Sequence, residues 1–193
     1  METDLTKLTP DVRTLNDMKD VLADRAWTQN AENCDLYYMY RGIETDGDLR
    51  YDITVIPPFL MGSEPVKTLG HFHAVGAKEM YIILEGEAIF LFQKGKDIVE
   101  DVYTISANKG ECVIIPEEYA HVTINPSSKE TLKLANWINV ISGFDYESVK
   151  KKGGLCYFYT SQGWVKNRNY EQVPELRYEE SLKKAPDNLD FLK

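Results

Sequence analysis

Short apolar runs separated by polar turns recur along the middle of this chain, and they predict many strands. Residues 88–93 are almost continuously apolar, as in a buried strand, whereas residues 49–56 alternate loosely between apolar and polar. Asp46-Gly47 is a typical hairpin turn. We predict strands over residues 35–41, 49–56, 67–73, 79–84, 88–93, 99–106, 111–115, 121–124, 132–141, 155–159 and 164–165. Short strands with polar turns between them indicate an all-β sandwich or barrel.

The two ends of the chain follow a different pattern. Between residues 15 and 22 apolar side chains recur at helical spacing, which predicts a short amphipathic helix over residues 16–26, capped by Asn16. Residues 145–152 predict one or two helical turns, and the charged residues 173–193 predict a peripheral helix or a loosely held tail. We therefore expect short peripheral helices at both ends of an otherwise β fold.

Length and composition favour one domain. The chain has 193 residues, of which 43% are hydrophobic, and it contains no low-complexity tract or interdomain linker. We expect residues 1–193 to form a single domain. Its predicted parts are a barrel core at about 35–165, an N-terminal extension at 1–34 and a C-terminal tail at 167–193.

Charge and cysteine usage exclude some partners and suggest a compartment. A net charge of −9 argues against nucleic acid or an anionic membrane as a partner. No apolar run approaches the length of a membrane span, and the N-terminus lacks a signal pattern. Cys34, Cys112 and Cys156 are widely spaced and odd in number, so we expect free thiols in a reducing cytoplasm.

The three histidines form the clearest chemical pattern. His71 and His73 are two residues apart, so on a strand their imidazoles point to the same side. Glu79 follows closely and could add an oxygen ligand, and His121 lies in a second apolar stretch. A lone strand histidine is usually an ordinary core or surface residue, but that explanation would have to hold for all three. We therefore expect a metal site with these four ligands.

Two stretches around these residues resemble the paired motifs of the cupin superfamily. In the first stretch, the pair His71 and His73 is followed by a spacer and then by Glu79, and Gly86 comes after six more residues. In the second, the matching positions are Gly110, Pro116, His121 and Asn125. The chain departs from the pattern in the longer spacer, residues 74–78, and in Glu118, where glycine is common. The resemblance implies a single cupin domain, a jelly-roll-like β-barrel.

The long spacer and the sequence Gly-His-Phe-His are similar to those of a narrower group, the cupin-type glucose-6-phosphate isomerases best known from archaea. The similarity covers about residues 12–155 and includes the N-terminal positions Val12-Arg13, Leu15, Asp17-Met18 and 24–27, outside the expected metal site. The group often has histidine where this chain has Phe144, so a substrate contact at that position is not expected here. This resemblance implies interconversion of glucose 6-phosphate and fructose 6-phosphate.

The resemblance also implies roles for particular residues. Glu79 is the candidate base, although tight metal binding would compete with that role, and Tyr81 would reach the substrate from the same side of the strand. A neutral phosphate cradle is implied at Thr54, Thr68, Gly70, Tyr81 and Tyr146. One divalent ion per subunit is implied, with Fe²⁺ favoured and Zn²⁺, Mn²⁺ or Ni²⁺ as substitutes.

Two other functions use the same ligands. One is a cupin Fe(II) dioxygenase, which would consume oxygen, and the other is a sugar-phosphate-binding cupin without turnover. The N-terminal similarity favours the isomerase, because neither alternative requires that segment. A homodimer is the default assembly, with the aromatic residues 35–41 as a candidate exchange or interface strand.

Overall fold

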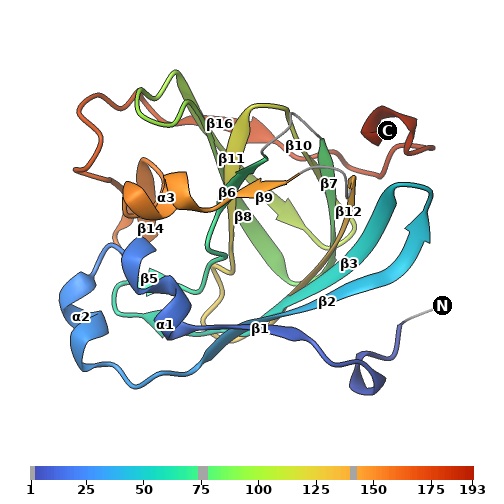
Figure 1. Ribbon diagram of the computed structural model, residues 1–193, viewed down its shortest axis with the longest axis horizontal. Helices are drawn as coiled ribbons and strands as arrows, with labels where there is room; N and C mark the ends of the chain where they lie inside the picture. Colours follow the sequence, from blue (N-terminus) through green and yellow to red (C-terminus); the bar gives the residue numbers. More distant parts are fainter. Residues whose placement is uncertain (1–2, 74–77, 140–142) are drawn as a thin grey trace.

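The computed structural model describes residues 3–73, 78–139 and 143–193. Two six-stranded sheets form its framework (Figure 1). The first sheet has, in spatial order, β1 (Asp11–Thr14), β2 (Asp35–Asp46), β3 (Leu49–Ile56), β12 (Leu132–Asn139), β7 (Glu79–Glu85) and β10 (Cys112–Ile115). The second has β13 (Phe144–Asp145), β6 (His71–His73), β11 (Tyr119–Ile124), β8 (Glu87–Lys94), β9 (Asp101–Asn108) and β16 (Arg177–Glu180).

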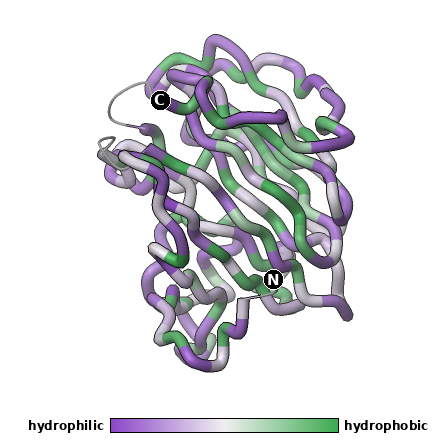
Figure 2. The backbone as a smooth tube through the Cα atoms, turned by 90° about the vertical axis from the view of Figure 1, so that its right-hand side faces the viewer, coloured by the Kyte–Doolittle hydropathy of each residue, from purple (hydrophilic) through white to green (hydrophobic). Residues whose placement is uncertain are grey.

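Apolar side chains from both sheets fill the space between them. Phe90 and Phe92 of β8 are fully buried, and the ring of Tyr81 from β7 lies 5.4 Å from that of Phe90 across the interior. The hydrophobic stretches follow the strands (Figure 2). The molecule is thus a jelly-roll-like sandwich, and the predicted all-β, jelly-roll-like fold is confirmed.

Two short hairpins and three short α-helices complete the fold. The hairpins pair β4 (Leu60–Met61) with β5 (Glu64–Pro65) and β14 (Tyr157–Thr160) with β15 (Gly163–Lys166). The helices are α1 (Leu15–Met18), α2 (Arg25–Asn30) and α3 (Glu147–Lys151), and they lie at one end of the sheets (Figure 1). Short 3₁₀ turns are η1 (Leu5–Lys7), η2 (Lys19–Val21) and η3 (Asp190–Leu192). No helix in the described ranges is long and apolar enough to cross a membrane.

The predicted helix over residues 16–26 is wrong in both its start and its continuity. It starts one residue earlier than predicted, and Asp17 accepts a hydrogen bond from the Thr14 amide at 2.8 Å, so Asn16 is not the cap. The helix is interrupted because the buried carboxylate of Glu64 accepts the Ala23 amide at 2.6 Å. Asp24 then caps a separate helix, α2.

The prediction of a peripheral helix or loose tail for residues 173–193 is also wrong. Strand β16 pairs in parallel with β9, and the guanidinium of Arg177 lies 2.7 Å from the carboxylate of Asp101. Leu182 then bridges to Cys112, and Leu192 is buried. The tail therefore pairs with β9 of the second sheet and bridges to β10 of the first, and only η3 is helical within it.

Three smaller expectations need correction or fall outside the structure. Of the predicted strand 67–73 only His71–His73 is strand, with Lys67 in an isolated bridge. Residues 35–41 lie within β2, where β1 pairs with residues 35–39 and β3 pairs from Tyr38 onward, and their role as an exchange or interface strand stays a prediction. Residues 74–77 of the motif spacer and the end of the predicted strand, 140–141, lie outside the described residues.

Candidate metal centre and active site

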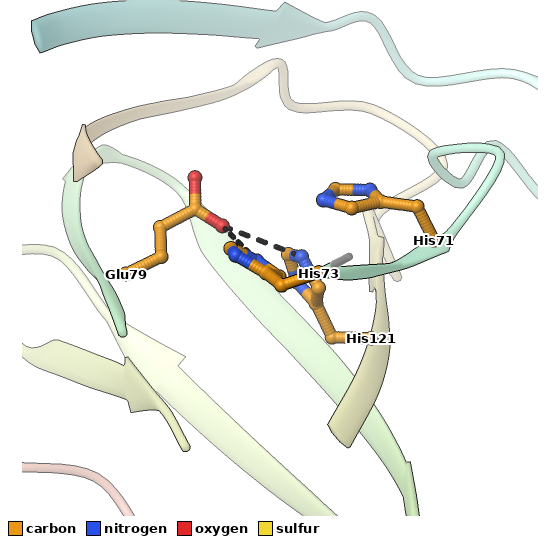
Figure 3. Close-up of side chains that lie close together, drawn as sticks. All are labelled: His71, His73, Glu79 and His121. Atoms are coloured by element: carbon orange, nitrogen blue, oxygen red, sulfur yellow. Dashed lines mark ion pairs between the residues drawn. The ribbon is translucent and has the colours of Figure 1, made fainter. Parts of the chain in front are cut away.

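Three strands bring the four predicted ligands together. Strand β6 begins at His71 and ends at His73, and His71 lies opposite His121 of the neighbouring strand β11. Glu79 is the first residue of β7 in the facing sheet. Figure 3 shows the Glu79 carboxylate facing the rings of His73 and His121, with His71 beside them. One ligand atom from each of the four residues lies within 4.8 Å of the others.

Gly70 is needed to start β6 at this place. Its φ is +82°, a left-handed conformation, and a Cβ there would lie 2.5 Å from Cγ1 of Val122 on β11. Glycine therefore lets the chain enter the sheet directly against its neighbour. The histidine that follows is thereby placed at the first position of the strand.

A hydrogen bond orients Glu79 toward the histidines. The side-chain amide of Asn136, on β12, donates to Oε1 of Glu79 at 2.6 Å. The other oxygen, Oε2, lies 3.5 Å from Nε2 of His73 and 3.4 Å from Nε2 of His121. One carboxylate oxygen is thus held by the sheet while the other faces the rings.

The ligand atoms are buried and lack partners within the described protein. These atoms are Nε2 of His71, Nδ1 and Nε2 of both His73 and His121, and Oε2 of Glu79. Buried polar atoms without partners are costly, and a divalent cation bound by nitrogen and oxygen ligands would satisfy most of them. The four residues therefore fit a divalent metal ion.

Burial also favours the protonation state that binds metal. It lowers the pKa of His71 to about 3, with the neighbouring His73 and Arg41 acting in the same direction. The pKa of His121 is lowered well below its ordinary value, again mainly by burial. Both rings are neutral near pH 7, and neutral imidazole is the form that coordinates a metal.

A pocket opens beside this cluster. Its lining includes His71, Glu79 and His121 and all of the residues expected to contact substrate, which are Thr54, Thr68, Gly70, Tyr81 and Tyr146. His73 is not among the residues that line this pocket, although its Nε2 lies 3.5 Å from Glu79 within the cluster. Three of the four candidate metal-site residues therefore border the pocket.

Comparisons with known proteins show the family of this chain. The family model described as "Glucose-6-phosphate isomerase (GPI)" matches residues 12–175. The chain belongs to this family. It is 34% identical to the glucose-6-phosphate isomerase of Pyrococcus furiosus over 161 residues, which cover 80% of this chain and 83% of that protein. It is 33% identical to that of Thermococcus litoralis over 148 residues, which cover 74% of this chain and 76% of that protein.

Solved structures show a partial likeness. One is a cupin-2 domain protein from Shewanella frigidimarina, with 21% identity, a TM-score of 0.37 and coverage of 51% of this chain and 78% of that one. Another is an oxalate oxidase, with 15% identity, a TM-score of 0.45 and coverage of 57% and 55%.

Within this pocket, Phe144 and Tyr146 both lie beside His71 but present different chemical groups. The ring of Phe144 packs edge-on against His71, with ring centres 4.8 Å apart, and supplies only an apolar wall. The ring of Tyr146 lies 5.1 Å from that of His71 and carries a hydroxyl at the pocket. The absence of histidine at position 144 thus leaves an apolar contact rather than a polar one.

Tyr81 and Thr68 keep hydroxyl protons that can be donated. Burial and the neighbouring Glu79 carboxylate raise the pKa of Tyr81 well above its ordinary value, so its phenol is neutral. Thr68 Oγ1 accepts a hydrogen bond from the amide of Thr123 at 2.9 Å, which leaves its proton available. Thr68 can therefore donate to a substrate oxygen, and Tyr81 can do so when its hydroxyl turns from the Glu79 carboxylate, to which it is hydrogen-bonded.

Four polar pocket residues were missed by sequence reasoning: Arg41, Arg50, Asp52 and Asn136. Arg50, Asp52 and Thr54 alternate along β3, so all three face the pocket. That alternation was readable from the sequence, because Thr54 was already a candidate. Asn136 could not be found this way, since it reaches the site only through the pairing of β12 with β7.

Proposed function

We propose that this protein is a metal-dependent isomerase that interconverts glucose 6-phosphate and fructose 6-phosphate. The observation that carries the proposal is the buried cluster of His71, His73, Glu79 and His121, whose unpartnered atoms border a pocket lined by hydroxyl groups. Family membership supports the choice of substrate. The pocket is lined by polar groups of the kind that bind a sugar phosphate.

The four residues of the cluster would hold one divalent ion per subunit. Three imidazoles and a carboxylate accept several first-row metals, and we favour Fe²⁺, with Zn²⁺, Mn²⁺ or Ni²⁺ as substitutes. When bound, such an ion would supply Lewis-acid stabilisation of negative charge that develops on the C1 and C2 oxygens.

Isomerisation moves a hydrogen between C1 and C2, either as a proton through a base or as a hydride. We assign the base to Glu79: Asn136 holds Oε1, and Oε2 faces the site, where it would act as the base when it is displaced from the metal. Tyr81 would donate its phenolic proton in a hydrogen bond to a substrate oxygen, which its raised pKa permits. Phe144, packed on His71, would exclude water from that end of the pocket.

The phosphate would lie at the end of the pocket lined by Thr54, Thr68, Gly70 and Tyr146. The Thr68 hydroxyl has its proton free to donate, as described above. The Gly70 amide adjoins His71, so a single sugar phosphate could contact this segment and the metal-site residues together. Hydroxyl and amide donors favour an anion without a glycine-rich loop.

Turnover of fructose 6-phosphate before and after EDTA treatment tests the function. We expect activity to disappear with EDTA and to return when Fe²⁺, Mn²⁺ or Zn²⁺ is added back. The His121→Ala variant should be inactive with each of these metals. A Lys184→Ala variant, changed at an exposed side chain of the tail, should behave as the wild type. No turnover with any metal despite a stoichiometric bound ion would refute the isomerase, and oxygen uptake would instead support the dioxygenase.

We also propose a homodimer in the cytoplasm. A two-fold symmetric dimer is the commonest assembly of soluble proteins. Cys34, Cys112 and Cys156 are all free thiols, which is consistent with a reducing compartment. Light scattering coupled to size exclusion would test the assembly, and a monomer mass near 22.2 kDa would refute the dimer.

A further inference from the structure

The hairpin of β2 and β3 contains a bulge at the rim of the pocket. Tyr40 pairs with Ile53 and Glu44 pairs with Tyr51, so residues 41–43 of β2 face Asp52 alone. Gly42 has a φ of +67°, and its amide donates to Oδ1 of Asp52 at 2.7 Å. Bulges of this kind redirect a side chain beside a functional site.

The redirected side chain is Arg41, which lines the pocket together with His71 and Tyr146. Arg41 is close enough to Tyr146 for its charge to oppose the rise that burial causes in the pKa of that phenol. Tyr146 in turn lies beside His71, with the two rings tilted and their centres 5.1 Å apart. Arg41 therefore lies at the same end of the pocket as the hydroxyls assigned to the phosphate.

Asp52 fixes the charges at this rim. Its side chain is 4% exposed and accepts hydrogen bonds from Nε of Arg50 at 2.8 Å and from Nη2 of Arg50 at 2.7 Å. Nη1 of Arg41 lies 3.6 Å from the same carboxylate. One carboxylate thus stands between two guanidinium groups. Asp11 also pairs with Arg41, so the two guanidinium groups face two carboxylates, and it is the directed N–H donors of Arg41 rather than a net charge that would favour an anion here.

The guanidinium of Arg41 has donors to spare. Nε is bound to Asp11 at 2.9 Å, Nη2 donates to the thioether sulfur of Met39 at 3.3 Å, and the guanidinium also contacts the Tyr146 hydroxyl. Sulfur is a weak acceptor, and the 3.6 Å separation of Nη1 from Asp52 is longer than a hydrogen bond. A guanidinium with both terminal nitrogens weakly engaged suits the oxygens of a phosphate group.

We propose that Arg41, directed by the bulge and held beside Asp52, contacts the phosphate group of the substrate and determines the preference for phosphorylated over neutral sugars. The identity of the sugar rests on the proposed function, whereas recognition of a phosphate by Arg41 does not. The hydroxyl cradle then positions the anion, and Arg41 supplies directed N–H donors.

Titration calorimetry of the metal-loaded protein with inorganic phosphate, fructose 6-phosphate and fructose tests this proposal. In Arg41→Ala we expect the dissociation constants for phosphate and fructose 6-phosphate to rise about ten- to hundredfold, with fructose binding unchanged. Arg41→Lys keeps the positive charge but lacks the paired N–H donors of a guanidinium group. Its dissociation constants for phosphate and fructose 6-phosphate should lie between those of Arg41→Ala and the wild type. Lys184→Ala, which removes the same charge from the tail, should match the wild type.

Kinetics separate this proposal from the proposed function. If the protein is an isomerase, Arg41→Ala should raise KM for fructose 6-phosphate by a similar factor and change kcat by less than about threefold, because a contact made equally in ground and transition state alters KM. Isomerisation with unchanged KM and phosphate affinity in Arg41→Ala would overturn the Arg41 assignment alone. A wild type without isomerase activity, together with phosphate binding that Arg41→Ala loses, would refute the isomerase and support the anion contact.

Discussion

Replacing Asn136 with alanine should weaken metal binding, although Asn136 is not itself one of the four candidate ligands. Its amide donates to Oε1 of Glu79 at 2.6 Å, and both residues are buried, with exposed fractions of 6% and 2%. Without that donor Oε1 is left in a buried site and Glu79 can rotate away from the histidines. A lost hydrogen bond to a charged group corresponds to about 1.5–3 kcal/mol. That range predicts a loss of about ten- to hundredfold in metal affinity, as is usual for residues that orient a ligand.

Metal affinity can be measured by letting the protein compete for Zn²⁺ with a chromogenic chelator of known Zn²⁺ affinity. Zn²⁺ is used because, unlike Fe²⁺, it is not oxidised during the titration. The control is Asn169→Ala, which removes the same amide group from an exposed side chain that donates to the Lys152 carbonyl. The reasoning is refuted if Asn136→Ala binds Zn²⁺ within threefold of the wild type while remaining folded. It is also refuted if the control loses affinity equally, since the effect would then not depend on Glu79.

Two further predictions concern stability. Glu118 has a φ of +67°, a conformation that favours glycine. Glu118→Gly should therefore raise the free energy of unfolding by up to about 1 kcal/mol, although it removes the ion pair with Lys94. A lowered urea midpoint would contradict this prediction. Lys183, the Asn108 amide and Ser181 lower the pKa of Glu111 to about 2, from an ordinary value of 4.5. A carboxylate with a lowered pKa stabilises the folded state above pH 4.5, and this contribution to the free energy of unfolding is lost as the pH falls toward 2. The difference in that free energy between wild type and Glu111→Gln should therefore shrink over this range. Urea midpoints at pH 7, 4 and 3 measure it, and a constant difference would contradict it.

The candidate metal centre was predictable because its residues are set by short local patterns in the sequence. His71 and His73 share a face through their two-residue spacing, and His121 and Glu79 fall at fixed places in recurring motifs. Strand pairing then only has to bring three short segments together. The second motif usually has glycine at the position of Glu118. Glu118 has a φ of +67°, the left-handed conformation that glycine favours, so the sequence departure coincides with an unusual backbone conformation.

The rest of the pocket depends on interactions between distant segments. Arg41 faces the pocket because a bulge opposite Asp52 shifts the register of β2, and a run of residues alone does not reveal a bulge. The helix over 16–26 fails for a similar reason, because the carboxylate that captures the Ala23 amide belongs to Glu64, far along the chain. Local periodicity predicts an element well only where no distant side chain competes for its backbone.

The register of the first sheet sets the distance between the proposed ends of the substrate. Asp52 lies opposite Asn136, and Asn136 lies opposite Tyr81, so one row of inward side chains runs from the arginine rim to the chemical site. Arg41 lies on β2 and Glu79 on β7, three strand spacings apart at about 4.8 Å each, so their backbones are about 14 Å from each other. Both residues line the same pocket, which they approach from different strands of one sheet. The two ends are thus held by one rigid sheet, and this is why substitutions at Arg41 and at Asn136 should separate phosphate binding from metal binding.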